Sequence, residues 1–114
     1  MRDAVLADLM VLAEVETTAV DCAVAPLEGG RTLRAPVGAH AADFLRSVAA
    51  DFDRIWVIAP ESDGILLQLC EAIGAARWVG CDADSTRIAS SKEATCARLA
   101  AAGIAVPWGW TFTW

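Results

Sequence analysis

The stretch RIWVIAPESDGIL, residues 54–66, decides the fold that the sequence predicts. Residues 55–59 are almost entirely apolar, which is typical of a parallel strand covered on both faces. Pro60 ends the strand, Ser62 can cap a following helix, and apolar residues at helical spacing continue to Gly74. A buried strand that passes directly into a helix predicts an α/β domain.

The flanking segments repeat this alternation. Apolar residues at intervals of three and four predict helices, and β-branched runs predict strands. The other expected helices cover residues 2–13, 39–51, 84–89 and 91–102, and the other expected strands cover residues 15–22 and 77–81. Residues 26–38, with two prolines and three glycines, are interpreted as an irregular surface connection. The predicted fold is therefore a small, doubly wound, Rossmann-like parallel sheet of about three strands flanked by helices, and an incomplete one.

Clear end signals surround the last of these helices. Ser90 and Glu93 have the spacing of a capping box, which predicts that Ser90 caps the helix. Gly103 stands where a left-handed C-terminal cap is expected, and Pro107 stops any continuation of the helix.

Composition disfavours several classes of protein. The 114-residue chain can build one compact domain, and alanine contributes much of its 56% hydrophobic content and its mean hydropathy of +0.44. The uncharged residues 104–114 are too few to span a bilayer, so we expect no membrane partner. A net charge of −6 disfavours nucleic acid as a partner. The charge order at the start of the chain is wrong for a secretory signal, and we expect a cytoplasmic protein.

The cysteines and the histidine do not have the spacing of a metal site. Four cysteines stand far apart without a C-x-x-C motif, and His40 is the one histidine. We therefore expect no metal ligands, and thiols that stay reduced and buried.

Two polar groups interrupt the apolar second half of the chain, residues 61–64 and residues 90–93. Both lie at expected helix starts, and ligands of open parallel sheets bind where strand ends and helix starts gather. Lys92 is unusual there, because a cation in the first turn faces the positive end of the helix dipole. A bound anion would remove that conflict.

Simpler interpretations of both groups stay open. Ser62 and Asp63 would then do no more than cap a helix. Lys92 would be a solvated side chain paired with Glu93 or Asp84.

These motifs resemble those of a known family. A strand followed by APESDGIL, WVG and IASSKEATCARLAAAGIAVP looks like the junction between the pre-ATP-grasp domain and the first helix of the ATP-grasp domain in ATP-dependent carboxylate–amine ligases. The pattern is most similar to the ATP-grasp proteins grouped with tyramine–glutamate ligase of methanofuran biosynthesis, which share I-A-P-E-[ST]-D-G-I-L. D-alanine–D-alanine ligases are similar more distantly. The resemblance covers residues 1–107, and the part after Ile55 is the specific one.

The resemblance implies roles for individual residues. Lys92 matches the lysine that reaches the ATP phosphates, and Ser91 replaces the aspartate of many relatives. Gly80 matches a glycine after a short strand, where the backbone turns tightly. Glu61, Ser62, Asp63 and Gly64 match a loop of the family that lies on the side of the acceptor substrate. A carboxylate in that loop could hold an amine or organise the loop.

The resemblance also implies how the chain is divided. Residues 1–90 would form a pre-ATP-grasp-like α/β domain, residues 91–107 the first helix of an ATP-grasp domain, and residues 108–114 an atypical aromatic tail. ATP and Mg²⁺ serve the full-length family, whose magnesium ligands and further cationic clamps match no segment of this chain. We therefore expect an N-terminal fragment of an ATP-grasp carboxylate–amine ligase, without catalytic residues of its own and without a tightly bound cofactor.

Two other functions stay open at this point. The question whether the chain is an enzyme therefore stays open as well. A stand-alone α/β module could bind a partner or form a homo-oligomer, because residues 108–114 hold three tryptophans and a phenylalanine. A flavodoxin-like regulator would need a phosphoacceptor, for which Asp21 and Asp82 are weak candidates.

Overall fold

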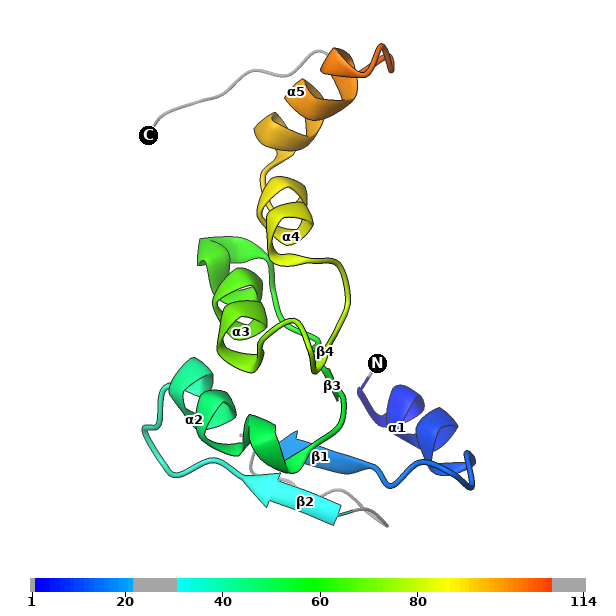
Figure 1. Cartoon of the computed structure of the whole chain (residues 1–114), viewed down its shortest axis with the longest axis vertical. Helices are drawn as coiled ribbons and strands as arrows, with labels where there is room; N and C mark the ends of the chain where they lie inside the picture. Colours follow the sequence, from blue (N-terminus) through cyan, green and yellow to red (C-terminus); the bar gives the residue numbers. More distant parts are fainter. Residues whose placement is uncertain (1, 22–30, 108–114) are drawn as a thin grey trace. The chain divides into compact units, whose positions relative to one another are not determined.

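The computed structural model describes residues 2–21 and 31–107 (Figure 1). The chain divides into two compact units, residues 1–44 and residues 45–114. The expected division after residue 90 stays a prediction, and the aromatic tail, residues 108–114, lies outside the described residues.

The first unit pairs two parallel strands. Its elements are α1 (Arg2–Met10), β1 (Thr18–Asp21), β2 (Arg31–Arg34) and the start of α2 (Ala41–Val48). The register sets Thr18 opposite Arg31 and Val20 opposite Leu33. Just before β1, Glu16 accepts a hydrogen bond of 3.2 Å from Nη1 of Arg31, so an exposed ion pair joins the start of both strands.

Strand β2 corrects the expectation of an irregular connection over residues 26–38. The strand reads Arg-Thr-Leu-Arg, with an exposed arginine at each end. The sequence therefore lacks the alternation of apolar and polar residues that marks a strand. Pairing with β1 supplies the backbone hydrogen bonds that local propensity does not predict.

The second unit contains a parallel strand pair joined through a helix. Strand β3 pairs with β4 so that Ile55 lies opposite Trp78 and Trp56 opposite Val79, and α3 lies in the crossover between them. After the end of α2, its elements are η1 (Ala49–Asp51), β3 (Ile55–Trp56), η2 (Ser62–Gly64), α3 (Ile65–Ile73), β4 (Trp78–Val79), α4 (Ala83–Ala89) and α5 (Lys92–Ala101).

Helix α3 supplies most of the buried side chains of the second unit. Four of its nine residues are buried, and α4 adds the buried Thr86. The buried residues of α3 are Leu69, Cys70, Ala72 and Ile73. The apolar spacing predicted Leu69, Cys70 and Ile73 on the inward face correctly, whereas Ile65, expected on the same face, is 37% exposed.

Strand β3 is shorter and more exposed than predicted. The expectation of a strand covered on both faces is wrong, because Trp56 is 55% and Ile58 54% exposed. A sheet of two short strands offers too little area for helices to cover both faces.

The α/β fold with parallel strands is confirmed. The described strands number four and form two separate pairs, instead of one sheet of about three. No helix within residues 2–21 and 31–107 is long and apolar enough to cross a membrane.

The predicted end of α5 is confirmed, and its predicted start is wrong by one residue. Gly103 has φ of +77°, its N–H bonds the Ala100 carbonyl, and the N–H of Ile104 bonds the Leu99 carbonyl, which is the Schellman arrangement. At the other end Ser91 is the cap, since its Oγ accepts a hydrogen bond from the backbone N–H of Ala94 at 3.1 Å. Ser90 instead ends α4.

Candidate functional site

The turn over residues 61–64 lies between β3 and α3, where the sequence predicted it. Asp63 has φ of 57° and Gly64 has φ of 68°, so two successive residues adopt the left-handed conformation. Gly64 is the N-cap of α3, and no side chain makes a capping hydrogen bond there. The interpretation of Ser62 and Asp63 as plain N-caps is therefore wrong.

The polar side chains of this turn point into solvent. Glu61, Ser62 and Asp63 are all exposed. Within residues 2–21 and 31–107 none of the three makes a side-chain hydrogen bond or an ion pair. Two carboxylates and a hydroxyl, carried by a backbone with left-handed residues, are thus available to a ligand.

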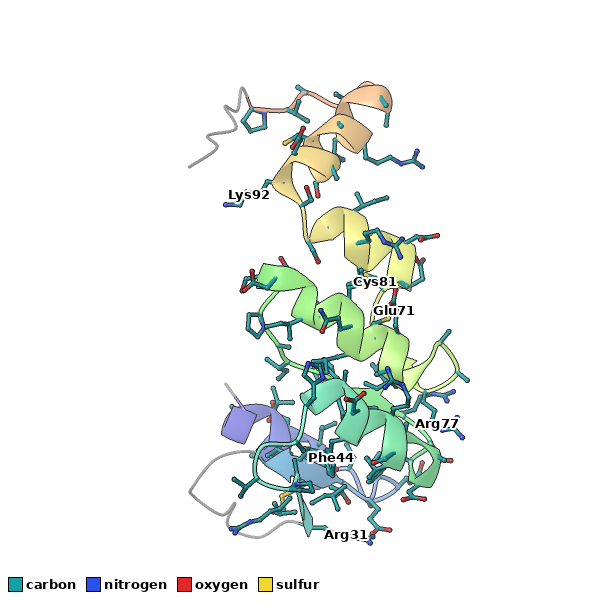
Figure 2. The ribbon with its side chains drawn as sticks, turned by 90° about the vertical axis from the view of Figure 1, so that its left-hand side faces the viewer. Arg31, Phe44, Glu71, Arg77, Cys81 and Lys92 are labelled. Carbon is teal, nitrogen blue, oxygen red and sulfur yellow. The ribbon has the colours of Figure 1, made fainter. Side chains whose placement is uncertain are left out.

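Lys92 is the first residue of α5 and the only lysine of the chain. Its side chain is exposed and extends outward from the helix (Figure 2). It forms no ion pair in the described part of the chain, and Asp84 instead pairs with Arg87 on α4. The pairing of Lys92 with Glu93 or Asp84 is therefore not observed, although Glu93 places a carboxylate in the same first turn, where the helix dipole favours it.

Lys92 and the turn belong to the same unit but do not bond each other among the described residues. The turn precedes α3, α3 contacts α4, and α4 contacts α5. In Figure 2 the Lys92 side chain extends to the left, the side of the view on which α3 begins. Three consecutive helices thus connect the two predicted groups.

Gly80 has a structural role other than the expected tight backbone turn. Its φ is not positive, and a Cβ at this position would lie 2.7 Å from Nε1 of Trp78. The indole folds over the glycine and donates a hydrogen bond of 2.8 Å to the carbonyl of Cys81. The glycine therefore leaves room for a side chain that fixes the loop after β4.

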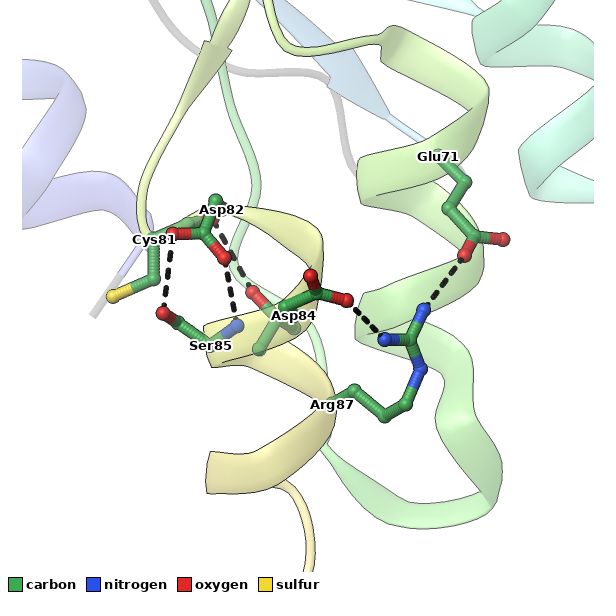
Figure 3. A network of polar contacts seen from close by, with 7 residues as sticks. Glu71, Cys81, Asp82, Asp84, Ser85 and Arg87 are labelled. Atoms are coloured by element: carbon green, nitrogen blue, oxygen red, sulfur yellow. Dashed lines mark hydrogen bonds and ion pairs between the residues drawn. The ribbon is translucent and has the colours of Figure 1, made fainter.

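Asp82 caps α4, a role that the sequence analysis missed. Its Oδ1 accepts from the backbone N–H of Ser85 at 2.7 Å, and its Oδ2 accepts from the Ser85 hydroxyl at 3.1 Å (Figure 3). The backbone bond first, and the hydroxyl second, hold the pKa of Asp82 below its usual value. The signal was present, because aspartate directly before a helical stretch is a common N-cap.

Arg87 joins α4 to α3. Its guanidinium pairs with Asp84 on its own helix, and its Nη2 lies 3.6 Å from Oε1 of Glu71 on α3 (Figure 3). Beside Glu71, burial raises the pKa of the Cys70 thiol, and the carboxylates of Glu71 and Asp82 raise it further. This thiol is therefore held in its protonated form.

Two arginines tie together the segments that precede β3 and β4. Nη1 of Arg54 donates to the carbonyls of Asp53 and Ala76, both at 2.9 Å, and Nε of Arg77 donates to the carbonyl of Phe52 at 3.1 Å. A hollow of about 290 Å³ lies between these segments, at the opposite strand ends from the 61–64 turn. In these bonds a side chain from one segment reaches the backbone of the other, and no pattern in the sequence indicates them.

Metal ligands do not gather in the described residues. Residues 2–21 and 31–107 contain no group of three or more His, Cys, Asp or Glu side chains that could hold a metal ion. At the predicted positions the structure shows an exposed ammonium group and two exposed carboxylates, all unpaired in this part of the chain.

Comparison with protein-family models identifies a family for this chain. A family model described as the pre ATP-grasp 3 domain matches residues 13–86. The comparisons with curated proteins and with solved structures gave no match.

Proposed function

We propose, because this chain belongs to the pre ATP-grasp 3 domain family, that it supplies the pre-ATP-grasp part of an ATP-dependent carboxylate–amine ligase. The match over residues 13–86, more than half of the chain, is the observation that carries the proposal. It includes β1, β2, β3, η2, α3 and β4, and with them the turn at residues 61–64. In ligases of this kind ATP activates a carboxylate as an acyl phosphate, which an amine then attacks.

Lys92 is the proposed contact with the ATP phosphates. An exposed ammonium group without an ion pair in the described residues can meet a phosphate without first breaking another interaction. Ser91, which replaces the aspartate of many relatives, caps the same helix with its hydroxyl. Lys92 alone supplies little of a nucleotide site, so we expect weak affinity from this chain.

The turn at residues 61–64 is the proposed contact with the acceptor amine. The carboxylates of Glu61 and Asp63 attract an ammonium group, and no described residue competes for them. The motif I-A-P-E-S-D-G-I-L, residues 58–66, favours an acceptor like that of the tyramine–glutamate ligase group. This turn binds and orients the amine, while the groups that stabilise the transferred phosphate belong to the ATP-grasp part of the ligase.

Acylation of the single lysine tests the role of Lys92. We expect Mg-ATP at millimolar concentration to slow the reaction of Lys92 with an amine-acylating reagent, relative to the α-amino group of the same chain. Peptide mass spectrometry measures both rates. Adenosine with Mg²⁺, which lacks phosphates, is the matched control. Equal rates with and without ATP, or the same slowing by adenosine, would contradict a phosphate contact.

A pair of small amines tests the role of the turn. Tyramine should shift the backbone amide NMR signals of residues 61–64, and N-acetyltyramine, which lacks the ammonium group, should not. Glu61→Gln combined with Asp63→Asn should abolish the shifts. Shifts of equal size with both compounds would show that the carboxylates do not select an amine.

Self-association is a second candidate function. Trp56, Ile58 and Val79 are 55%, 54% and 42% exposed around the β3–β4 pair, and burying such apolar area on a second copy would stabilise a dimer. The proposed role of residues 108–114 in this contact rests on their composition, since they lie outside the described residues.

A further inference from the structure

Helix α5, which carries Lys92, is not fixed by buried side chains. None of its ten residues is buried, whereas α3 has four buried residues and α4 has one. The direction in which α5 leaves α4 therefore depends on polar contacts at the junction between the two helices.

Thr95 makes the long-range contact at this junction. Its Oγ1 donates a hydrogen bond of 2.8 Å to the carbonyl of Ile88, on the last turn of α4. The backbone N–H of Ser91 bonds the same carbonyl at 3.1 Å. The threonine hydroxyl therefore adds a side-chain bond to a helix-end carbonyl that already accepts a backbone N–H, and this added bond holds α5 against α4.

Helix α4 is in turn fixed to α3. Thr86 is buried and its Oγ1 donates to the Cys81 carbonyl at 3.3 Å, in the loop that precedes α4. Arg87 reaches Glu71 on α3 (Figure 3). Because α3 starts directly after the turn at residues 61–64, a continuous set of contacts runs from that turn to Lys92.

We propose that α4 sets the separation between the two substrate-binding groups, with Thr95 as the residue that positions Lys92. This inference rests on the proposed roles of Lys92 and of the 61–64 turn. Thr95 touches neither substrate. Its hydroxyl fixes the angle at which α5 presents the ammonium group, and without that bond α5 samples a wider range of directions.

Paramagnetic broadening tests this inference without any nucleotide. An amine-reactive nitroxide is attached to the isotope-labelled chain, where it reacts with Lys92 and with the α-amino group. The Lys92→Arg variant carries the nitroxide only at its α-amino group, so its spectrum gives the broadening that does not come from position 92. We expect broadening of the Asp63 and Gly64 amides in the unsubstituted chain. Thr95→Val, which has nearly the same shape but no hydroxyl, should at least halve that broadening, and Thr95→Ser should retain it.

A second variant guards against an effect of the added methyl group. Thr95→Ala removes the hydroxyl and the γ-methyl without adding a group, and Thr95→Ser controls for the lost methyl. Thr95→Ala should reduce the broadening like Thr95→Val, with the amide shifts of α3 unchanged in both. Full broadening in either variant, loss of broadening in Thr95→Ser, or no broadening in the unsubstituted chain would overturn the inference. Equal acylation of Lys92 with and without ATP would instead overturn the phosphate contact, so the two failures are distinguishable.

Discussion

Trp78 and Gly80 form a tight local fit at the residue scale, because the indole occupies the space that a Cβ at position 80 would need. Gly80→Ala should displace the indole and break its hydrogen bond to the Cys81 carbonyl. We expect the free energy of unfolding to fall by about 1 kcal/mol, the usual net contribution of such a bond. Urea denaturation followed by tryptophan fluorescence measures the change.

A double-mutant cycle isolates this contact. In a Trp78→Phe background the ring no longer donates a hydrogen bond, so adding Gly80→Ala should cost clearly less than it does in the original chain. Equal costs in the two backgrounds would mean that Gly80 is needed for a reason other than the indole.

Acidification should weaken the cap that Asp82 makes on α4. The pKa of Asp82 is lower in the folded chain than its usual value of 3.8, so its carboxylate stabilises the fold above that pH. The contribution is lost as the pH falls through the lowered, folded-state pKa. The difference in unfolding free energy between the original chain and Asp82→Asn should therefore shrink between pH 5 and pH 2.

Urea denaturation at several pH values measures that difference, and Glu93→Gln, which removes an exposed carboxylate from α5, serves as the control. A difference that stays constant on acidification would contradict the carboxylate cap.

The turn before α3 gives a prediction at the scale of the element. Asp63 has a left-handed backbone, which costs roughly 1–2 kcal/mol for most residues and less for Asp or Asn. Asp63→Val should lower the free energy of unfolding by about 1–2 kcal/mol, and Asp63→Asn should leave it unchanged. Thermal denaturation compares the two variants. If Asp63→Asn also abolishes the tyramine shifts, the charge of Asp63 serves binding and its conformation serves the turn.

Local signals predicted the elements well where one residue type decides the geometry. Gly103 fixed the end of α5 because a left-handed C-cap favours glycine. Ser90 and Ser91 are adjacent, so the spacing to Glu93 selected the wrong one. Strand β2 was missed because its hydrogen bonds come from β1, which no local pattern reveals.

The places of the two polar groups at helix starts were predictable, their geometry was not, and their binding roles stay predictions. Residues 61–64 and Lys92 stand out in the sequence by polarity and by the direction of the helix dipole. The left-handed Asp63, the indole over Gly80 and the contact of Thr95 with Ile88 depend on backbone angles and on neighbours in space. Such features follow from tertiary structure.

At the scale of the whole molecule, Mg-ATP should raise the melting temperature by no more than about two degrees. A ligand present at its own dissociation constant adds about 0.4 kcal/mol to stability, which corresponds to a shift of about two degrees in a small domain. Differential scanning fluorimetry measures the shift. A much larger one would contradict the view that this chain carries only the edge of the nucleotide site.

The exposed apolar residues predict association of the whole chain. Light scattering after size-exclusion chromatography should show a mass that rises with protein concentration. Trp56→Ser should reduce the association, because a 55% exposed side chain can be replaced without disturbing the core. Deletion of residues 108–114 separates their contribution from that of Trp56. A constant monomer mass at high concentration would remove self-association as a candidate function.

The bonds of Arg54 and Arg77 have a consequence for the order of folding. Arg54 bonds the Ala76 carbonyl, 22 residues away, and Arg77 bonds the Phe52 carbonyl, 25 residues away. Neither bond can form until the intervening chain has closed into a loop, and that closure has an entropy cost that grows only slowly with length. Helix α3 lies inside the loop and has local backbone hydrogen bonds, so we expect it to form before the two arginine bonds and the β3–β4 pairing.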